Sequence, residues 1–144
     1  MEKSTSANWV KLLIIFNAVS IFAIVVLFEL LKFAENRIWL AGLEILLVIA
    51  VLVTFYKAYW QTGLWSLSHK KTEKLDEREM QLISDSLKVS YSVFTIVTLL
   101  IIYAVAVIEK GPIDVVIAAG LLYFAHILPS AILGWRGEMK GHNE

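Results

Sequence analysis

The chain of 144 residues contains no cysteine, and its 13 basic residues are balanced by 13 acidic ones. Without cysteine it has no disulfide scaffold, thiol redox centre, zinc–thiolate site or iron–sulfur cluster. A net charge of zero argues against a nucleic-acid binder that relies on a basic surface. Only 18% of the residues are charged and 58% are hydrophobic, whereas soluble domains average about 25% and about 45–50%. This composition excludes a disordered chain and predicts an integral membrane protein.

Four long apolar runs account for the hydrophobic excess. They contain 17 to 21 residues each, and they are Leu12–Phe28, Ile38–Tyr56, Val89–Ile108 and Val115–Trp135. About 20 helical residues cross ~30 Å of hydrocarbon, and these runs lack the recurring polar face of a soluble amphipathic helix. We therefore predict four transmembrane helices, with spans at about residues 10–31, 38–59, 89–109 and 113–135.

The first run follows Lys3 and Lys11 and so has one property of a cleaved signal peptide. A signal-peptide core usually has about 7–15 residues and ends at a site with small residues. Here the apolar run is longer and continues into residues 29–33, Glu-Leu-Leu-Lys-Phe, without such a site. We expect it to be retained as a membrane span.

The distribution of basic residues predicts the orientation. Ten of the thirteen lysines and arginines lie at the N-terminus, in or beside the segment 61–88, or after the fourth span. Because basic residues are enriched on the cytoplasmic side, both termini and the segment 61–88 are predicted to be cytoplasmic. The hairpin tips around Glu35 and Gly111-Pro112 then face outside. Indole rings prefer the headgroup level, and four tryptophans fit the inner boundaries: Trp9, Trp60, Trp65 and Trp135.

The short outer connections force consecutive spans into antiparallel helical hairpins. The predicted fold is all-α: a polytopic integral membrane protein of the cell (inner) membrane, with residues 1–144 in a single antiparallel four-transmembrane-helix bundle. Ser130 and Gly134 are small residues at four-residue spacing that allow close helix contact. The sequence leaves open whether the bundle forms a homo-oligomer.

The segment 61–88 is predicted to be a cytoplasmic loop followed by an extension of the third helix. Asp76 suits the N-cap position, and Glu79 three residues later can complete a capping box. Glu77 in the first turn complements the helix dipole. Upstream of this cap, we expect Trp65 to insert at the membrane surface while nearby lysines contact anionic headgroups: Lys70, Lys71 and Lys74.

The run Leu75-Asp76-Glu77-Arg78-Glu79, continuing through Ile83 towards Tyr91, resembles a group of uncharacterised small prokaryotic four-helix membrane proteins. These proteins carry an Asp-Glu-Arg signature before the third span. The order of parts matches over most of the chain: a hairpin, a polar loop with the signature, and a second hairpin. The resemblance implies a bacterial or archaeal cell membrane and no activity. The signature is either a helix cap with solvated charges or a docking surface for a cytosolic partner or a neighbouring subunit.

Glu44 is the only acidic residue inside the four apolar runs, about 9 Å from the outer start of its predicted span at 1.5 Å per residue. Charged groups in spans are costly and often functional, so Glu44 is expected to face the bundle. Tyr103 lies at a matching depth and is its predicted partner, with Lys32 and Arg37 as alternatives. Glu44 is either a proton- or cation-linked carboxylate or a buried carboxyl that joins the two hairpins.

A second set of polar residues is centred on His126. Tyr123, His126 and Ser130 share one helix face, and Pro129 is expected to kink that helix. Further polar side chains come from the first and third spans: Asn17, Ser20, Tyr91, Thr95 and Thr98. The predicted cluster could bind water or a small ligand, or relay a proton, since histidine exchanges protons near neutral pH. The alternative is interhelical hydrogen bonding alone.

Several chemistries have no support in the sequence. His69 and His142 lie outside the predicted spans, which leaves His126 without a second intramembrane histidine for haem ligation. The chain has no HExxH zinc motif, glycine-rich phosphate loop or Ser-His-Asp order in a recognisable context. We therefore expect no enzyme activity, no cofactor, no metal and no nucleic-acid partner.

The sequence is compatible with three functions. The favoured one is an accessory or regulatory membrane protein that acts through partner or subunit contact at its cytoplasmic loop. The alternative is an oligomeric transporter, of a small solute or linked to protons, that uses Glu44 or His126. It is less favoured because small exporters place a carboxylate in the middle of the first span, where this chain has Asn17 and Ser20. The third is a membrane enzyme or lipid-binding protein that uses the polar cluster.

Overall fold

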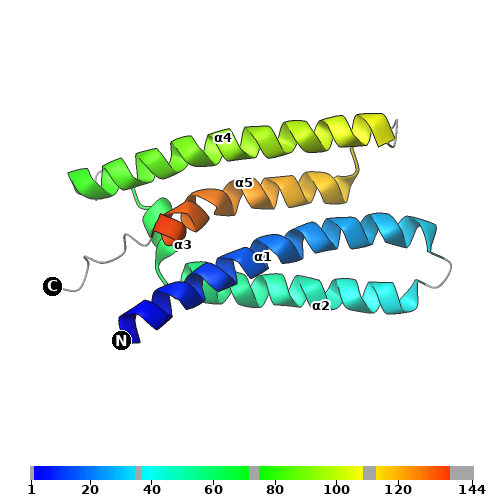
Figure 1. The fold of residues 1–144 in the computed structure, drawn as a ribbon, viewed down its shortest axis with the longest axis horizontal. Helices are drawn as coiled ribbons and strands as arrows, with labels where there is room; N and C mark the ends of the chain where they lie inside the picture. Colours follow the sequence, from blue (N-terminus) through cyan, green and yellow to red (C-terminus); the bar gives the residue numbers. More distant parts are fainter. Residues whose placement is uncertain (1, 35–36, 72–74, 109–112, 137–144) are drawn as a thin grey trace. The chain divides into compact units, whose positions relative to one another are not determined.

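The computed structural model describes residues 2–34, 37–71, 75–108 and 113–136 (Figure 1). All regular structure in these ranges is helical, as predicted. The elements are α1 (Glu2–Phe33), α2 (Ile38–Phe55), the π-helix η1 (Tyr56–Trp60), α3 (Leu64–Ser68), α4 (Glu77–Ile108) and α5 (Val115–Arg136). Some residues used in the predictions lie outside the described ranges: Glu35, Lys74, Gly111, Pro112 and His142.

Four stretches of helix are long and apolar enough to cross a membrane: Asn8–Phe33, Ile38–Trp60, Glu77–Val105 and Val115–Arg136. The chain therefore has four helices of membrane-spanning length, as predicted. The first and third are longer than predicted because α1 and α4 each contain 32 residues. Such a helix measures about 48 Å at 1.5 Å per residue, against about 30 Å of hydrocarbon. One part of each helix therefore extends beyond the hydrocarbon.

The chain divides into two compact units, Met1–Thr62 (unit 1) and Gly63–Glu144 (unit 2). Each unit contains one of the predicted helical hairpins, α1 with α2 in unit 1 and α4 with α5 in unit 2 (Figure 1). The assembly of both hairpins into a single bundle stays a prediction.

In unit 1, α1 is joined to α2 by a buried amide. Asn17 Nδ2 donates to the Val51 carbonyl oxygen at 3.0 Å and to Thr54 Oγ1 at 2.8 Å. Thr54 Oγ1 in turn donates to the carbonyl oxygen of Ala50 at 2.7 Å. Asn17 is fully buried, and hydrocarbon offers no hydrogen-bonding partner. The amide therefore has to find its partners on α2, and this ties the two helices together.

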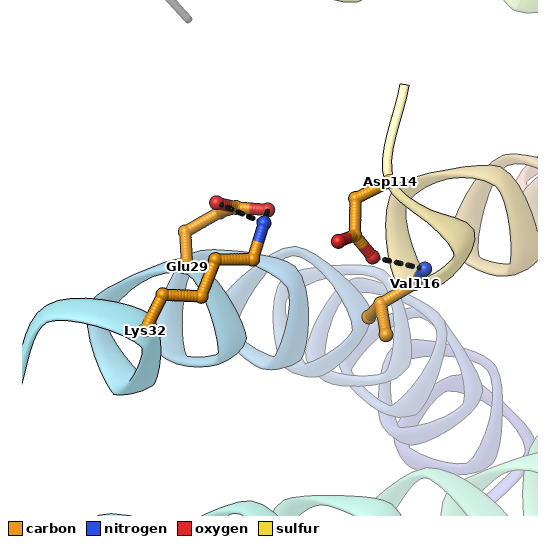
Figure 2. A network of polar contacts seen from close by, with 4 residues as sticks. All are labelled: Glu29, Lys32, Asp114 and Val116. Atoms are coloured by element: carbon orange, nitrogen blue, oxygen red, sulfur yellow. Dashed lines mark hydrogen bonds and ion pairs between the residues drawn. The ribbon is translucent and has the colours of Figure 1, made fainter. Parts of the chain in front are cut away.

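Two further features mark the ends of the unit 1 helices. Near the end of α1, Lys32 Nζ and Glu29 Oε2 form an ion pair at 2.8 Å (Figure 2). At the other end of the hairpin, α2 continues into η1, where the Gln61 amide donates to the Tyr56 carbonyl oxygen at 2.9 Å. A π-helical turn is wider than an α-helical turn. Within it, the sequence neighbours Ala58 and Tyr59 are both completely buried.

In unit 2, a carboxylate sets the start of α5. Asp114 Oδ1 accepts a hydrogen bond from the Val116 amide at 2.8 Å (Figure 2). This satisfies one of the amides that the first turn of a helix leaves without a partner. α5 then runs through Pro129 to Arg136 as one continuous helix. The short helix α3 packs against α5.

The role of Asn17 in the α1–α2 contact generates a stability prediction. Replacing Asn17 with alanine removes both bonds to α2, and we expect a loss of about 0.6–1.7 kcal/mol of unfolding free energy, the range measured for hydrogen bonds within membranes. The measurement is unfolding by SDS titrated into mixed micelles. Asn8→Ala is the matched control, because Asn8 is exposed on the same helix. Equal stability of the two variants would show that the buried amide contributes nothing to the hairpin.

Candidate functional site

The start of α4 carries the Asp-Glu-Arg signature. The Glu79 amide donates to Asp76 Oδ1 at 2.6 Å, and the Met80 amide donates to the Asp76 carbonyl oxygen at 2.9 Å. These two bonds confirm Asp76 as the N-cap and the start of α4 at Glu77. The aspartate oxygen satisfies an amide that the helix itself leaves without a partner.

Glu79 differs from its predicted role in a capping box. Its Oε2 accepts a hydrogen bond from Lys70 Nζ at 2.7 Å, and the two side chains are mostly buried. A cation is a stronger partner for a carboxylate than a peptide amide is, so Glu79 pairs with Lys70 rather than returning to the Asp76 backbone. The pair connects the segment after α3 to the first turn of α4.

The connection between the units is ordered where it enters α3. Gly63 has a φ of +74° and precedes Leu64, the first residue of α3. A side chain strongly disfavours this left-handed conformation, whereas glycine adopts it readily. Ser68, at the end of α3, lies with its Oγ 2.7 Å from Ser130 Oγ of α5, and Ser130 is fully buried. α3 is thus fixed on α5 by a hydroxyl–hydroxyl hydrogen bond.

Three rings gather where α3 meets α5. Trp65 stacks on His69, with ring centroids 4.1 Å apart and planes at 27°. The His126 centroid lies 5.2 Å from that of Trp65 and 5.3 Å from that of His69. We call these three residues the Trp–His cluster. Trp65 therefore contacts imidazole rings, and its insertion at the membrane surface stays a prediction.

His69 was not among the predicted members of the cluster around His126, since the sequence places it outside the predicted spans. The segment 64–69 folds back along α5 and brings the two imidazoles together, 57 residues apart in sequence. The four-residue spacing of Trp65 and His69 predicts a shared helix face. Contact with His126 follows only from the tertiary packing of α3.

The remaining predicted cluster residues have no described contact that links them to His126. Asn17 belongs to unit 1 and bonds to α2, as described above. Thr95 Oγ1 donates to the Tyr91 carbonyl oxygen one turn earlier on the same helix, at 2.8 Å. Tyr123 is half-buried on α5. Of the predicted members, the structure places Ser130 near His126, through the packing of α3 on α5.

Glu44 and Tyr103 lie in different units, so their pairing stays a prediction. Glu44 is half-buried on α2, and its carboxylate has no hydrogen bond or ion pair among the described residues. Tyr103, on α4, is 71% exposed. Within the same described ranges, no three histidine or acidic side chains gather in a group that could hold a metal ion.

The first three turns of α4 present a mixed surface. Its exposed residues include Glu77, Arg78, Met80, Gln81, Ser84, Leu87 and Lys88. Met80 and Leu87 are 43% and 50% exposed, and Lys88 pairs with Asp85 at 3.5 Å. Acidic, basic and large apolar side chains therefore alternate on one helical surface.

Comparison with protein-family models, with curated proteins and with solved structures finds no match to this chain.

The Ser68–Ser130 bond generates a prediction about α3. In a double-mutant cycle of Ser68→Ala and Ser130→Ala, we expect a coupling of about 0.6 kcal/mol, the average for side-chain hydrogen bonds in membranes. The readout is the free energy of unfolding in mixed micelles. A cycle of Ser68→Ala with Ser92→Ala is the control, because the Ser92 hydroxyl bonds only within α4, to the Lys88 carbonyl oxygen at 3.1 Å. Additive effects in the first cycle would contradict the anchoring of α3 by this bond.

Proposed function

We propose that the protein is an accessory or regulatory multi-pass membrane protein that binds a protein partner on the cytoplasmic side. The contact surface is the first part of α4, residues 77–88, with the Asp-Glu-Arg signature at its tip. Its cytoplasmic placement rests on the excess of lysine and arginine around this segment and at both termini, which is typical of cytoplasmic loops.

The observation that carries the proposal is the length of α4. The helix contains 32 residues, and crossing the hydrocarbon takes about 20 of them. About twelve residues, some 18 Å at 1.5 Å per residue, then extend into water as a helix. The extension is capped by Asp76 and connected to the segment after α3 by the Lys70–Glu79 pair, so its first turn is stabilised without a partner.

The composition of the extension supports a protein contact. Arginine and methionine are enriched at protein interfaces, and Arg78 and Met80 lie exposed in its first turn. Exposed ion pairs contribute little to stability, typically below 1 kcal/mol. The charges beyond the cap are therefore available for recognition without a large effect on the fold.

Orientation is the first test. We expect green fluorescent protein fused after Glu144 to fluoresce and alkaline phosphatase at the same position to be inactive, because the positive side of the protein stays in the cytoplasm. The two reporters fused after Gly111 should give the reverse pattern. An active phosphatase after Glu144 would place residues 77–88 outside and overturn the proposal.

Partner contact is tested by a photo-crosslinking amino acid at Met80, in membranes of the native host. We expect a discrete product of higher mass, whose size distinguishes another protein from a second copy of this chain. Leu99 is the matched control, because it is 61% exposed on the same helix but lies in the predicted span. The variant Glu77→Lys/Arg78→Glu should reduce the product at least about tenfold, equivalent to 1.4 kcal/mol. Equal products from Met80 and Leu99, or no effect of the charge reversal, would contradict docking at this surface.

One observation favours the alternative of an oligomeric transporter. The Glu44 carboxylate has no hydrogen bond or ion pair among the described residues, and a lone carboxylate within a span is costly. In a transporter, Glu44 would bind the coupled proton or cation. Complementation of a deletion strain separates the two functions. If the protein is an accessory protein, we expect Glu44→Gln to complement the deletion strain and Glu77→Lys/Arg78→Glu to fail. If it is a transporter, we expect Glu44→Gln to fail and Glu77→Lys/Arg78→Glu to complement.

A further inference from the structure

The Trp–His cluster contains two imidazoles whose roles are not explained by partner binding. His69 lies at the end of α3 and His126 near the middle of α5, and both are on the surface of unit 2. The ring of His126 contacts Trp65 and His69, and it has no hydrogen bond among the described residues.

The hydrogen bonds of His69 determine which nitrogen is free. Its Nδ1 lies 2.9 Å from the Trp65 carbonyl oxygen and 3.0 Å from Ser68 Oγ. A carbonyl oxygen only accepts hydrogen bonds, so Nδ1 carries the proton. The neutral ring then has its lone pair on Nε2. A backbone carbonyl that holds Nδ1–H in this way is the usual outer partner of a metal-binding histidine, because it fixes the tautomer and the ring orientation.

The separation of the two rings matches a shared ion. Metal–nitrogen bonds of about 2.0–2.1 Å place each imidazole centroid about 3.2 Å from the ion. Two centroids 5.3 Å apart then subtend about 110° at the ion, close to the tetrahedral angle of zinc sites. A shared ion requires one nitrogen of His126 to face the same point as His69 Nε2.

The donor set selects the class of ion. Imidazole nitrogens favour Zn²⁺, Cu²⁺ and Ni²⁺, whereas Ca²⁺ and Mg²⁺ require oxygen ligands. The nearby cation, Lys70, is paired with Glu79 at 2.7 Å, which offsets its repulsion of an approaching ion. Two coordination positions remain for water, since the described residues offer no third histidine or acidic ligand.

We propose that His69 and His126 together bind one divalent transition-metal ion, Zn²⁺ or Cu²⁺, and that the ion fixes α3 against α5. This site is independent of the partner surface on α4. An ion that binds the folded protein but not the unfolded chain also raises the thermal stability of the protein.

The test uses the full chain with an affinity tag that contains no histidine, in lipid nanodiscs. Zn²⁺ binding is measured by calorimetry, and Cu²⁺ binding by the quenching of tryptophan fluorescence. We expect one ion per chain, with an affinity at least about tenfold weaker in His69→Ala and in His126→Ala. His142→Ala should bind as the unaltered protein does. In Trp65→Phe, calorimetry should still detect the ion while the quenching by Cu²⁺ decreases.

Where an alanine variant fails to fold, His126→Gln gives the same test, because glutamine keeps a polar side chain of similar length but is a poor ligand for Zn²⁺. Unchanged affinity in the histidine variants would overturn the proposal, as would loss of binding in His142→Ala alone. The absence of any Zn²⁺ or Cu²⁺ binding by the unaltered protein would overturn it as well. None of these outcomes depends on whether residues 77–88 bind a partner.

Discussion

The constraint behind this structure is that hydrocarbon offers no hydrogen bonds, so a polar group in a span is stabilised by a partner within the protein. Asn17 shows the consequence in unit 1, where its amide reaches two oxygens of α2. In unit 2 the same constraint joins Ser68 to Ser130. Lipid tails are as apolar as leucine side chains, so apolar contacts alone do not hold these elements in one position. Each of the two polar contacts therefore links elements that would otherwise be free to slide. Few polar residues therefore determine how the helices of each unit pair.

The same constraint explains why the surroundings of Glu44 differ from those of Glu29 and Asp114, which lie at the ends of their helices. Glu29 pairs with Lys32 one turn away, and Asp114 caps α5. Both lie where water or a helix end supplies compensation. Glu44 lies within the apolar part of α2 without such a partner among the described residues. A carboxyl without a partner in such a position is costly.

Much of the architecture was predictable because it depends on local sequence. Runs of apolar residues of sufficient length determined the four spans, and the spacing of Asp76 and Glu79 determined the start of α4. Each of these patterns acts within one or two helical turns. The partner of Glu79 was not predictable in this way, since Lys70 precedes it by nine residues and lies outside α4. The meeting of His69 with His126 depends on contacts between segments far apart in sequence, which hydropathy does not encode.

The separation of Ser68 from Ser130, 62 residues in the sequence, has a consequence for biosynthesis. The bonds of Asn17 span only 34 and 37 residues, and both partners lie in the half of the chain that is made first. The first hairpin can therefore complete its internal bonds while the ribosome is still translating the second. The bond between α3 and α5 cannot form until Ser130 has been synthesised. The order of synthesis thus makes the docking of α3 a late step in maturation.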